Sequence, residues 1–209
     1  MEFEYTDKGT NTLSIGFAGF YDTNPRFDWN ILKRYETDVL LIKDVKMAWY
    51  LLGIDGISNN VDETVVFIRK YTYKYKKLMF FGSSMGGYAA ILYGSLVNHN
   101  DKTINAFSPQ VDIRPDIKDD RYSNQWTVRA VREKVHPYIN DNDKRYMFLG
   151  NINIPEETYI HYGDGHKCDP HQASLINCKR LSYDYDGHSI AVWMHENQML
   201  RPYLTNLYK

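Results

Sequence analysis

Residues 82–86 read Gly-Ser-Ser-Met-Gly, so that small residues stand two positions before and two positions after Ser84. An apolar run, 78–81, precedes this pattern, and a run of small residues, 86–97, follows it as a predicted helix. A serine on so tight a strand-to-helix turn is lifted out of the sheet, and glycine avoids collisions at the flanking positions. The helix N-terminus behind it favours developing negative charge. Ser84 is therefore the candidate nucleophile.

A serine nucleophile needs a general base, and His188 stands where one is expected. It follows the last predicted strand, 180–185, and a predicted helix begins directly after it. The loop at the C-terminal end of such a strand lies at the same sheet edge as the nucleophile. A helix-capping or surface histidine is the plain structural alternative.

The acid of such a site is expected in the segment 162–171, because the chain order in this arrangement is serine, acid, histidine. Asp169 precedes Pro170, where an aspartate can simply cap a helix. Asp164 stands between two glycines, where aspartate is ordinary in a turn. The loop must reach sideways toward the histidine, which favours Asp169, and Asp164 stays open as the alternative.

The same segment also permits a metal hypothesis. Four potential zinc ligands occur within six residues, namely His166, Cys168, Asp169 and His171, and Cys178 could join them. Their spacing matches none of the usual structural zinc patterns, which pair ligands across two knuckles. We therefore predict neither a metal nor a cofactor.

An oxyanion formed at Ser84 would need two backbone donors. One is expected to be the N–H of Met85, directly after the nucleophile. The other should come from the loop after an earlier strand, and the segment 13–19 is such a strand. The N–H of Phe20 is the candidate, although a glycine turn that merely ends the strand would look the same.

The elements that must position these residues alternate along the chain. Strands are predicted at 13–19, 38–44, 78–82, 103–107, 158–163 and 180–185. Helices are predicted at 27–35, 61–76, 86–97, 125–136, after Asp169, and from 189 to about 200, with Pro202 just beyond. This alternation predicts a three-layer α/β fold, a mostly parallel sheet with helices on both faces. No linker or repeat divides the chain, so residues 1–209 are predicted to form one domain.

Composition excludes several other classes of protein. The 209 residues include 43% hydrophobic and 24% charged side chains, as in ordinary globular domains. The net charge of −1 gives no field to attract nucleic acid, and the basic, tyrosine-rich run 69–77 is more often a solvated helix face. Two cysteines suit a reducing compartment, and no signal segment begins the chain, so we expect a cytoplasmic protein. The uncharged stretch 78–97 has the length of a membrane span, but its four glycines favour a strand, a turn and a helix.

These motifs together resemble the α/β-hydrolase-fold serine enzymes. More narrowly, the chain is similar to compact hydrolase-like proteins of bacterial surface-polysaccharide and glycoprotein-export loci and their phage relatives. The more specific pieces are Ser-Met-Gly-Gly-Tyr-Ala-Ala at 84–90 and Phe-Ser-Pro-Gln at 107–110. The resemblance implies an α/β-hydrolase-like fold, and it implies Ser84, Asp169 and His188 as a catalytic triad. The chain is short for this fold and leaves few residues for a lid, so we expect a minimal lid. Some relatives look like glycan O-acetyltransferases or deacetylases.

Three hypotheses for function follow. The first is a serine esterase that acts through an acyl-enzyme on an acylated glycan or a small ester, or an acyltransferase that passes the acyl group to a sugar hydroxyl. The second is a non-catalytic binding protein on a hydrolase fold. The third is a metal-dependent hydrolase that uses His166, Cys168 and His171. We expect no nucleic-acid partner and no membrane insertion, and the sequence leaves a homo-oligomer or a protein partner open.

Overall fold

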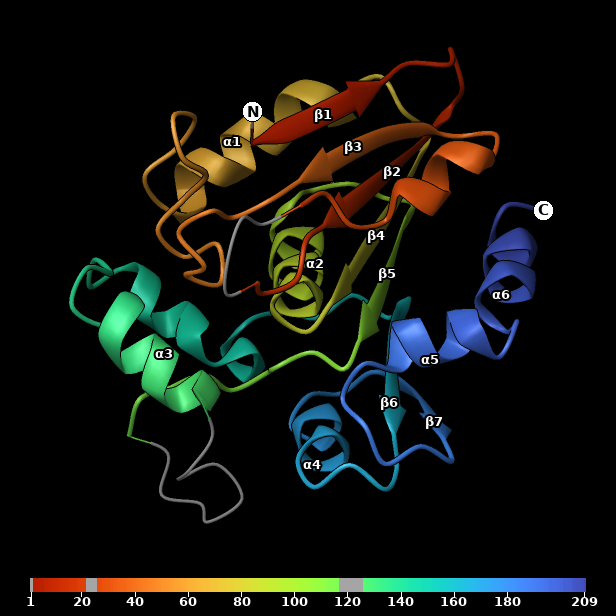
Figure 1. Cartoon of the computed structure of the whole chain (residues 1–209). Coiled ribbons are helices and arrows are strands. Elements are labelled where there is room, and N and C mark those ends of the chain that lie inside the picture. Colours follow the sequence, from red (N-terminus) through yellow and green to blue (C-terminus); the bar gives the residue numbers. More distant parts are fainter. Residues whose placement is uncertain (1, 22–25, 117–125) are drawn as a thin grey trace.

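A computed structural model describes residues 2–21, 26–116 and 126–209 of the chain. In this part of the chain seven strands form one sheet in the order β1-β3-β2-β4-β5-β6-β7 (Figure 1). Strand β1 pairs with β3 in the antiparallel sense, and every other neighbouring pair is parallel. The strands are β1 (Phe3–Thr6), β2 (Thr12–Phe17), β3 (Asp38–Ile42), β4 (Lys77–Ser83), β5 (Lys102–Phe107), β6 (Thr158–Gly163) and β7 (Lys179–Tyr183).

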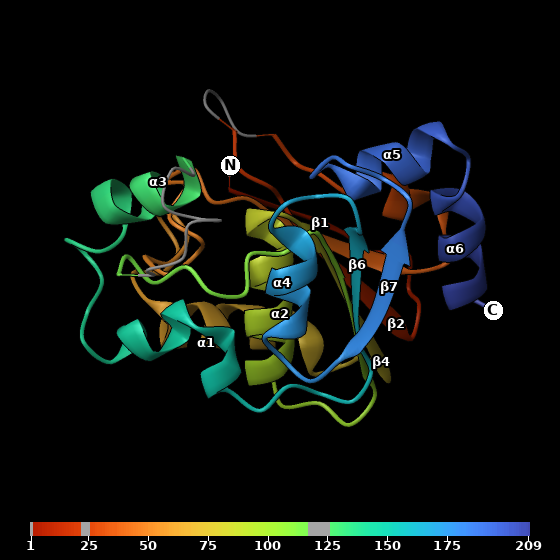
Figure 2. The same cartoon turned by 90° about the horizontal axis from the view of Figure 1, so that it is seen from below.

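Helices cover both faces of this sheet. Helices α1 (Val61–Thr72), α2 (Met85–Leu96), α3 (Trp126–Lys134) and α4 (Asp169–Ser174) contribute to one apolar core. The 3₁₀ helix η1 (Asn30–Arg34) and helices α5 (Ile190–Glu196) and α6 (Leu200–Leu207) contribute to a second core on the other face. Figure 2 shows α1, α2 and α4 on one side of the sheet and α5 and α6 on the other. The predicted three-layer α/β architecture is therefore confirmed.

The central strands are apolar because both of their faces are covered. All five residues of β3 are buried, as are Leu78 to Gly82 of β4. A strand that is buried on both faces reads as a continuous apolar run, which made these strands visible in the sequence. The uncharged stretch 78–97 divides into β4, the turn at Ser84 and α2. No helix in the described part of the chain is long and apolar enough to cross a membrane.

Several elements differ from the sequence prediction, and one of them is η1, a 3₁₀ helix at Asn30–Arg34 where a helix over 27–35 was predicted. Strand β1 was not predicted, because it is a half-buried edge strand of only four mixed residues. It is held by its ladder with β3 and by the rings of Phe3 and Tyr5, which lie against Tyr71. Short edge strands carry little periodic signal.

The single helix predicted from residue 189 to about residue 200 is wrong. Helix α5 ends at Glu196, Gln198 adopts a left-handed conformation with φ of 59°, and α6 begins at Leu200. Pro202 lies inside the first turn of α6 rather than beyond a helix end. Proline fits there because the first N–H groups of a helix have no intrahelical acceptor.

The longest connection between strands runs from β5 to β6 and carries α3, η2 (Asp143–Met147) and η3 (Leu149–Asn151). Its described residues are tied to the body of the molecule. The hydroxyl of Tyr88 donates to the carbonyl of Tyr146 at 2.6 Å, and Val131 and Leu149 are buried in the first core. This connection therefore completes one helical layer.

Candidate active site

The parallel sheet brings the C-terminal ends of β4, β5, β6 and β7 to one edge. The registers pair Ser83 with Phe107, Phe107 with His161, and Gly163 with Tyr183. The loops that follow these strands carry Ser84, Gln110, Asp169 and His188. Open α/β sheets bind ligands at this edge.

Ser84 occupies the turn between β4 and α2 with φ of 55° and ψ of −119°. This is a strained conformation for a residue other than glycine, and such strain is concentrated at functional sites. The turn is closed so tightly that a Cβ on Gly82 would lie 1.9 Å from the carbonyl oxygen of Gly86. A Cβ on Gly86 would lie 2.3 Å from the carbonyl oxygen of Phe17. Both glycines are thus required by close backbone approach, as the sequence pattern predicts.

His188 lies in the loop between β7 and α5 and contacts two of the predicted residues. Its Nε2 is 2.9 Å from Ser84 Oγ. Its Nδ1 is 2.9 Å from Asp169 Oδ1 and 3.0 Å from Oδ2. Since a carboxylate only accepts, Nδ1 carries a proton, and in the neutral ring Nε2 is then the acceptor for the serine hydroxyl.

Asp169 is the carboxylate that reaches the histidine, and Asp164 is exposed. Asp169 is the first residue of α4 and is only 3% exposed, and no side chain caps this helix. Burial alone would raise the pKa of Asp169, but hydrogen bonds from His166 and His188 outweigh burial and hold its pKa below the usual range. The carboxyl is therefore charged at neutral pH.

His166 is a second imidazole on the same carboxylate. Its Nδ1 lies 2.9 Å from Asp169 Oδ1, and its ring centre is 5.3 Å from that of His188. These three side chains are the one group in the described residues with metal-ligand atoms of three residues within 4.8 Å of one another. The ligand set considered from the sequence is not assembled, because Cys168 and His171 are not part of this group.

Gln110 was not assigned a role from the sequence, yet it contacts the nucleophile. Its Nε2 is 3.0 Å from Ser84 Oγ and 3.2 Å from His188 Nε2. Its Oε1 accepts a hydrogen bond from Trp49 Nε1 at 3.2 Å. The available signal was its place just after β5, at the edge where Ser84 and Asp169 also follow strands.

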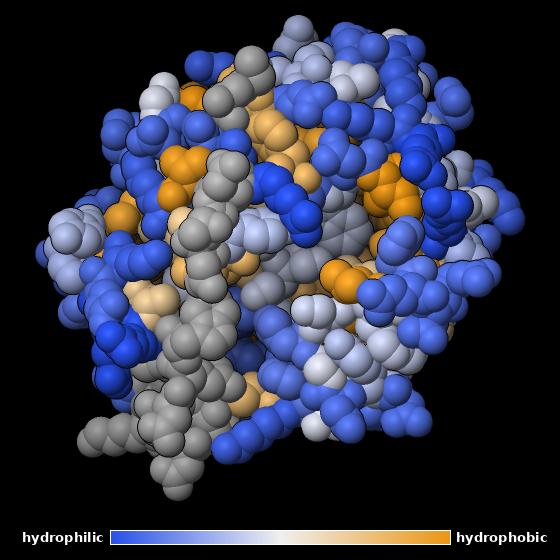
Figure 3. Space-filling model, in the orientation of Figure 1, coloured by the Kyte–Doolittle hydropathy of each residue, from blue (hydrophilic) through white to orange (hydrophobic). Residues whose placement is uncertain are grey.

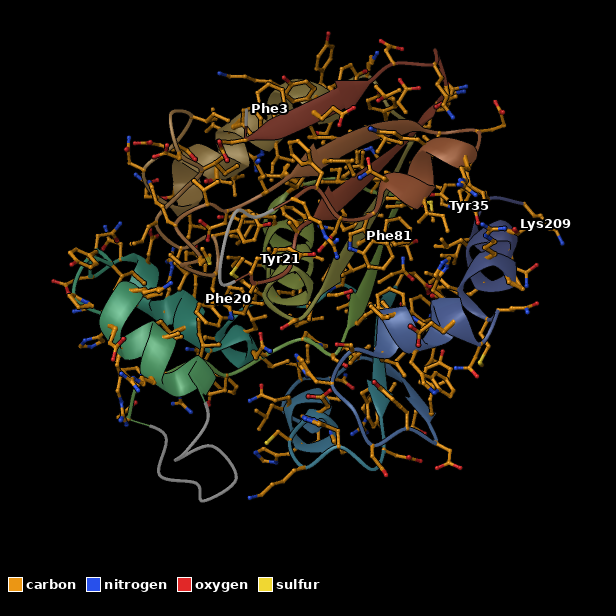
Figure 4. The ribbon with its side chains drawn as sticks, viewed as in Figure 1. Phe3, Phe20, Tyr21, Tyr35, Phe81 and Lys209 are labelled. Carbon is orange, nitrogen blue, oxygen red and sulfur yellow. The ribbon has the colours of Figure 1, made fainter. Side chains whose placement is uncertain are left out.

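The two predicted oxyanion donors lie on different elements, Met85 at the start of α2 and Phe20 on the loop after β2. Met85 is the first residue of α2, so its N–H has no acceptor within the helix. Phe20 lies on the loop after β2, where Figure 4 shows it beside Tyr21 and on the α3 side, with Lys134 Nζ 5.1 Å from its ring centre. The N–H of Gly19 is already committed to Asp28 Oδ2 at 2.9 Å. The assignment of the Phe20 N–H as the second oxyanion donor stays a prediction.

A cavity of about 500 Å³ opens beside the pair formed by Ser84 and His188. It is lined by their sequence neighbours Ser83 and Ser189. The larger apolar side chains of the lining are Phe20, Trp29, Ile31, Val192 and Leu200, and Arg26, Asp28 and His195 add charged or polar groups. The surface of the molecule in this orientation is largely hydrophilic, with hydrophobic side chains in separate patches (Figure 3).

Known structures share this fold at low sequence identity. Brefeldin A esterase, a bacterial homologue of human hormone-sensitive lipase, superposes with a TM-score of 0.65 and 10% identity over 99% of this chain and 71% of its own. An S-formylglutathione hydrolase from Agrobacterium tumefaciens gives 0.53 and 15% over 91% and 83% of the two chains. A lipase-esterase related protein from Clostridium acetobutylicum gives 0.53 and 14% over 99% of both.

No protein-family model matches the sequence, and no curated protein sequence matches it. The structural likeness and the sheet topology together show that the chain has the α/β-hydrolase fold. At these identities the likeness concerns the fold alone.

Proposed function

We propose that the protein is a serine hydrolase of the esterase class in which Ser84, His188 and Asp169 form a catalytic triad. The observation that carries this proposal is the continuous chain of contacts from Ser84 Oγ to His188 Nε2 at 2.9 Å and from His188 Nδ1 to the buried Asp169 carboxylate at 2.9 Å. A nucleophile, a base and a group that orients the base are the parts that acyl transfer requires.

The reaction divides into two halves. His188 Nε2 takes the hydroxyl proton as Ser84 Oγ forms a bond to the ester carbonyl carbon, and Asp169 stabilises the imidazolium. The amides of Met85 and Phe20 hold the oxyanion. The tetrahedral intermediate expels the alcohol, which takes the proton from His188, and an acyl-enzyme remains. Water then gives its proton to His188 and attacks the acyl carbon, which releases the acid and restores the Ser84 hydroxyl.

The cavity beside the site supports a small ester or the acylated position of a glycan as substrate. Its apolar walls suit the acyl group, and its volume of about 500 Å³ is within the range of small-molecule sites. The same acyl-enzyme can pass its acyl group to a sugar hydroxyl instead of water. We treat transfer to a carbohydrate hydroxyl as a second outcome of one mechanism.

The test is turnover of p-nitrophenyl esters with acyl chains from acetyl to octanoyl. We expect hydrolysis by the native chain, loss of about 10³-fold or more in Ser84→Ala, and no loss in the matched control Ser95→Ala. Adding oligosaccharide acceptors and following acyl transfer by mass spectrometry distinguishes the transferase. A folded protein that turns over no ester and transfers no acyl group would contradict the proposal and favour a binding role.

A further inference from the structure

We infer that Gln110 is a further catalytic residue of this site: its amide donates to Ser84 Oγ and thereby directs the serine proton to His188. Trp49 is a positioning residue that fixes the amide in this orientation. The inference rests on the proposed function, because it concerns how the same nucleophile is activated.

The orientation of the Gln110 amide follows from its contact with Trp49. An indole Nε1–H can only donate, so the amide atom that faces it at 3.2 Å must be the carbonyl oxygen. The amide nitrogen therefore faces Ser84 and His188. Gln110 is 8% exposed and Trp49 is fully buried, so solvent does not compete for these contacts.

The direction of the serine proton follows in turn. Ser84 Oγ lies 3.0 Å from Gln110 Nε2 and 2.9 Å from His188 Nε2. The amide nitrogen only donates, so Ser84 Oγ accepts from it, and the single hydroxyl proton is left for His188. A hydroxyl that could otherwise rotate among three positions is thus held in the one position from which proton transfer starts.

The same amide also bears on the leaving alcohol. Gln110 Nε2 is 3.2 Å from His188 Nε2, but the single lone pair of that nitrogen accepts the serine proton, so the histidine does not accept the second amide N–H. This N–H is left for an acceptor that approaches His188 Nε2 after the proton has moved there from Ser84 Oγ. The ester oxygen that leaves, or the oxygen that enters in the second half-reaction, must lie beside His188 Nε2 to exchange that proton. Gln110 is therefore placed to bind this oxygen.

The Gln110 side chain is not needed to hold its own loop in place. The loop that carries it is held independently, because Gln172 Oε1 accepts from the N–H groups of Val111 and Asp112. The N–H of Leu149 also donates to the carbonyl of Val111 at 3.0 Å. Removing the Gln110 amide should therefore leave the loop in place.

The test is the rate at which a fluorophosphonate labels Ser84 in the full chain, with the site of the adduct read by peptide mass spectrometry. We expect Gln110→Leu to slow labelling about tenfold, the effect of one hydrogen bond to the reacting oxygen. Its thermal unfolding midpoint should stay within about 2 °C of the native value, and in ester turnover kcat should fall while KM does not rise.

Trp49→Phe should slow labelling about threefold in the native background and have no further effect in Gln110→Leu, because it acts through the amide. The matched control is Trp193→Phe, since Trp193 stacks on Tyr185 and is not among the residues that line the cavity, so its loss should leave labelling unchanged. A merely structural Trp49 would add its effect in both backgrounds.

Each outcome separates the two proposals. If Ser84 of the native protein is labelled and Gln110→Leu is labelled at the same rate, the inference about Gln110 is overturned and the triad stands. If the native protein is not labelled, the proposed function fails and the inference fails with it. Gln110→Glu, which keeps the side-chain size, is measured in parallel. Its carboxylate would accept a hydrogen bond from the serine hydroxyl and draw the proton away from His188, so Gln110→Glu should be labelled no faster than Gln110→Leu.

Discussion

Two buried aspartates, Asp38 and Asp169, lie at opposite ends of the parallel strands, and different hydrogen-bond donors hold them. Asp38 is the first residue of β3 and is fully buried. Burial alone would raise the pKa of Asp38, but hydrogen bonds from Tyr75, Thr10 and Lys8 outweigh burial and lower its pKa to about 2. Two of these donors are the backbone N–H groups of Lys8 and Thr10, each 3.0 Å from Oδ1.

Asp169, at the C-terminal edge, is nearly as buried, but two imidazoles hold it instead of backbone N–H groups. Amides and a tyrosine hydroxyl keep their protonation state across the physiological range, whereas an imidazole changes its charge there. The carboxylate at one edge therefore fixes the fold, and the carboxylate at the other can stabilise a charge that appears during a reaction. The difference lies in the donors and not in the depth of burial.

The largest expected effect separates the two aspartates by reactivity. Asp169→Asn should lower the rate of fluorophosphonate labelling at Ser84 about 10³–10⁴-fold, because an amide in its place no longer enforces the His188 tautomer or stabilises the imidazolium. Asp38→Asn should stay within about twofold of the native rate at a temperature where it is folded. Comparable losses of labelling rate in both variants would contradict the assignment of a reactive role to Asp169 alone.

The free energy of unfolding should depend more on Asp38 than on Asp169. Asp38→Asn should lower the free energy of unfolding by roughly 2–3 kcal/mol, since the buried donors of Lys8, Thr10 and Tyr75 lose a charged acceptor. Asp169→Asn should lower it by about 1 kcal/mol or less, because its partners are imidazoles that are partly exposed. Urea titrations at pH 7 measure both values, and the reverse order would contradict the assignment.

The decrease in the free energy of unfolding at acid pH should depend on Asp38. Its pKa is depressed in the folded state, so its contribution is fully present above the unfolded value near 4 and is lost as the pH falls toward 2. Roughly 2 kcal/mol of stability should disappear in the native chain between pH 5 and pH 2 for this reason. Urea midpoints across this range in native and Asp38→Asn protein provide the test; an equally steep loss in the variant would assign the acid sensitivity elsewhere.

The smallest expected effect concerns the second imidazole on Asp169. His166→Ala removes one of the two hydrogen bonds that lower the pKa of Asp169, but it leaves the bond from His188 intact. Labelling at pH 8 should fall by about threefold at most, while His188→Ala should abolish it. A loss in His166→Ala as large as that in His188→Ala would mean that the two histidines share the base function.

The sequence predicted the elements that carry a strong local signal. The turn requires the glycines around Ser84, because a Cβ on Gly82 or on Gly86 would lie only 1.9 or 2.3 Å from a backbone carbonyl oxygen. The placement of His188 and Asp169 followed from strand order, because parallel strands end at one edge. The structure places His188 against Ser84 and Asp169 against His188, and it leaves Asp164 exposed.

Other features depend on contacts that no local pattern reveals. Gln110 gains its orientation from Trp49, 61 positions earlier in the chain, through one hydrogen bond between side chains. Strand β1 has only four residues, too few for a periodic signal. The break between α5 and α6 depends on the left-handed conformation of Gln198. Glutamine is not a residue type that favours positive φ, so the sequence does not indicate a turn there.

The central claim is that Ser84 is a nucleophile activated by His188, and peptide-mapped labelling with a fluorophosphonate tests it most directly. We expect one adduct, on the peptide that contains Ser84, which is absent in Ser84→Ala and in His188→Ala. Circular dichroism of both variants controls for folding. An adduct on another residue, or no adduct on the folded native chain, would contradict the assignment of Ser84 as the nucleophile.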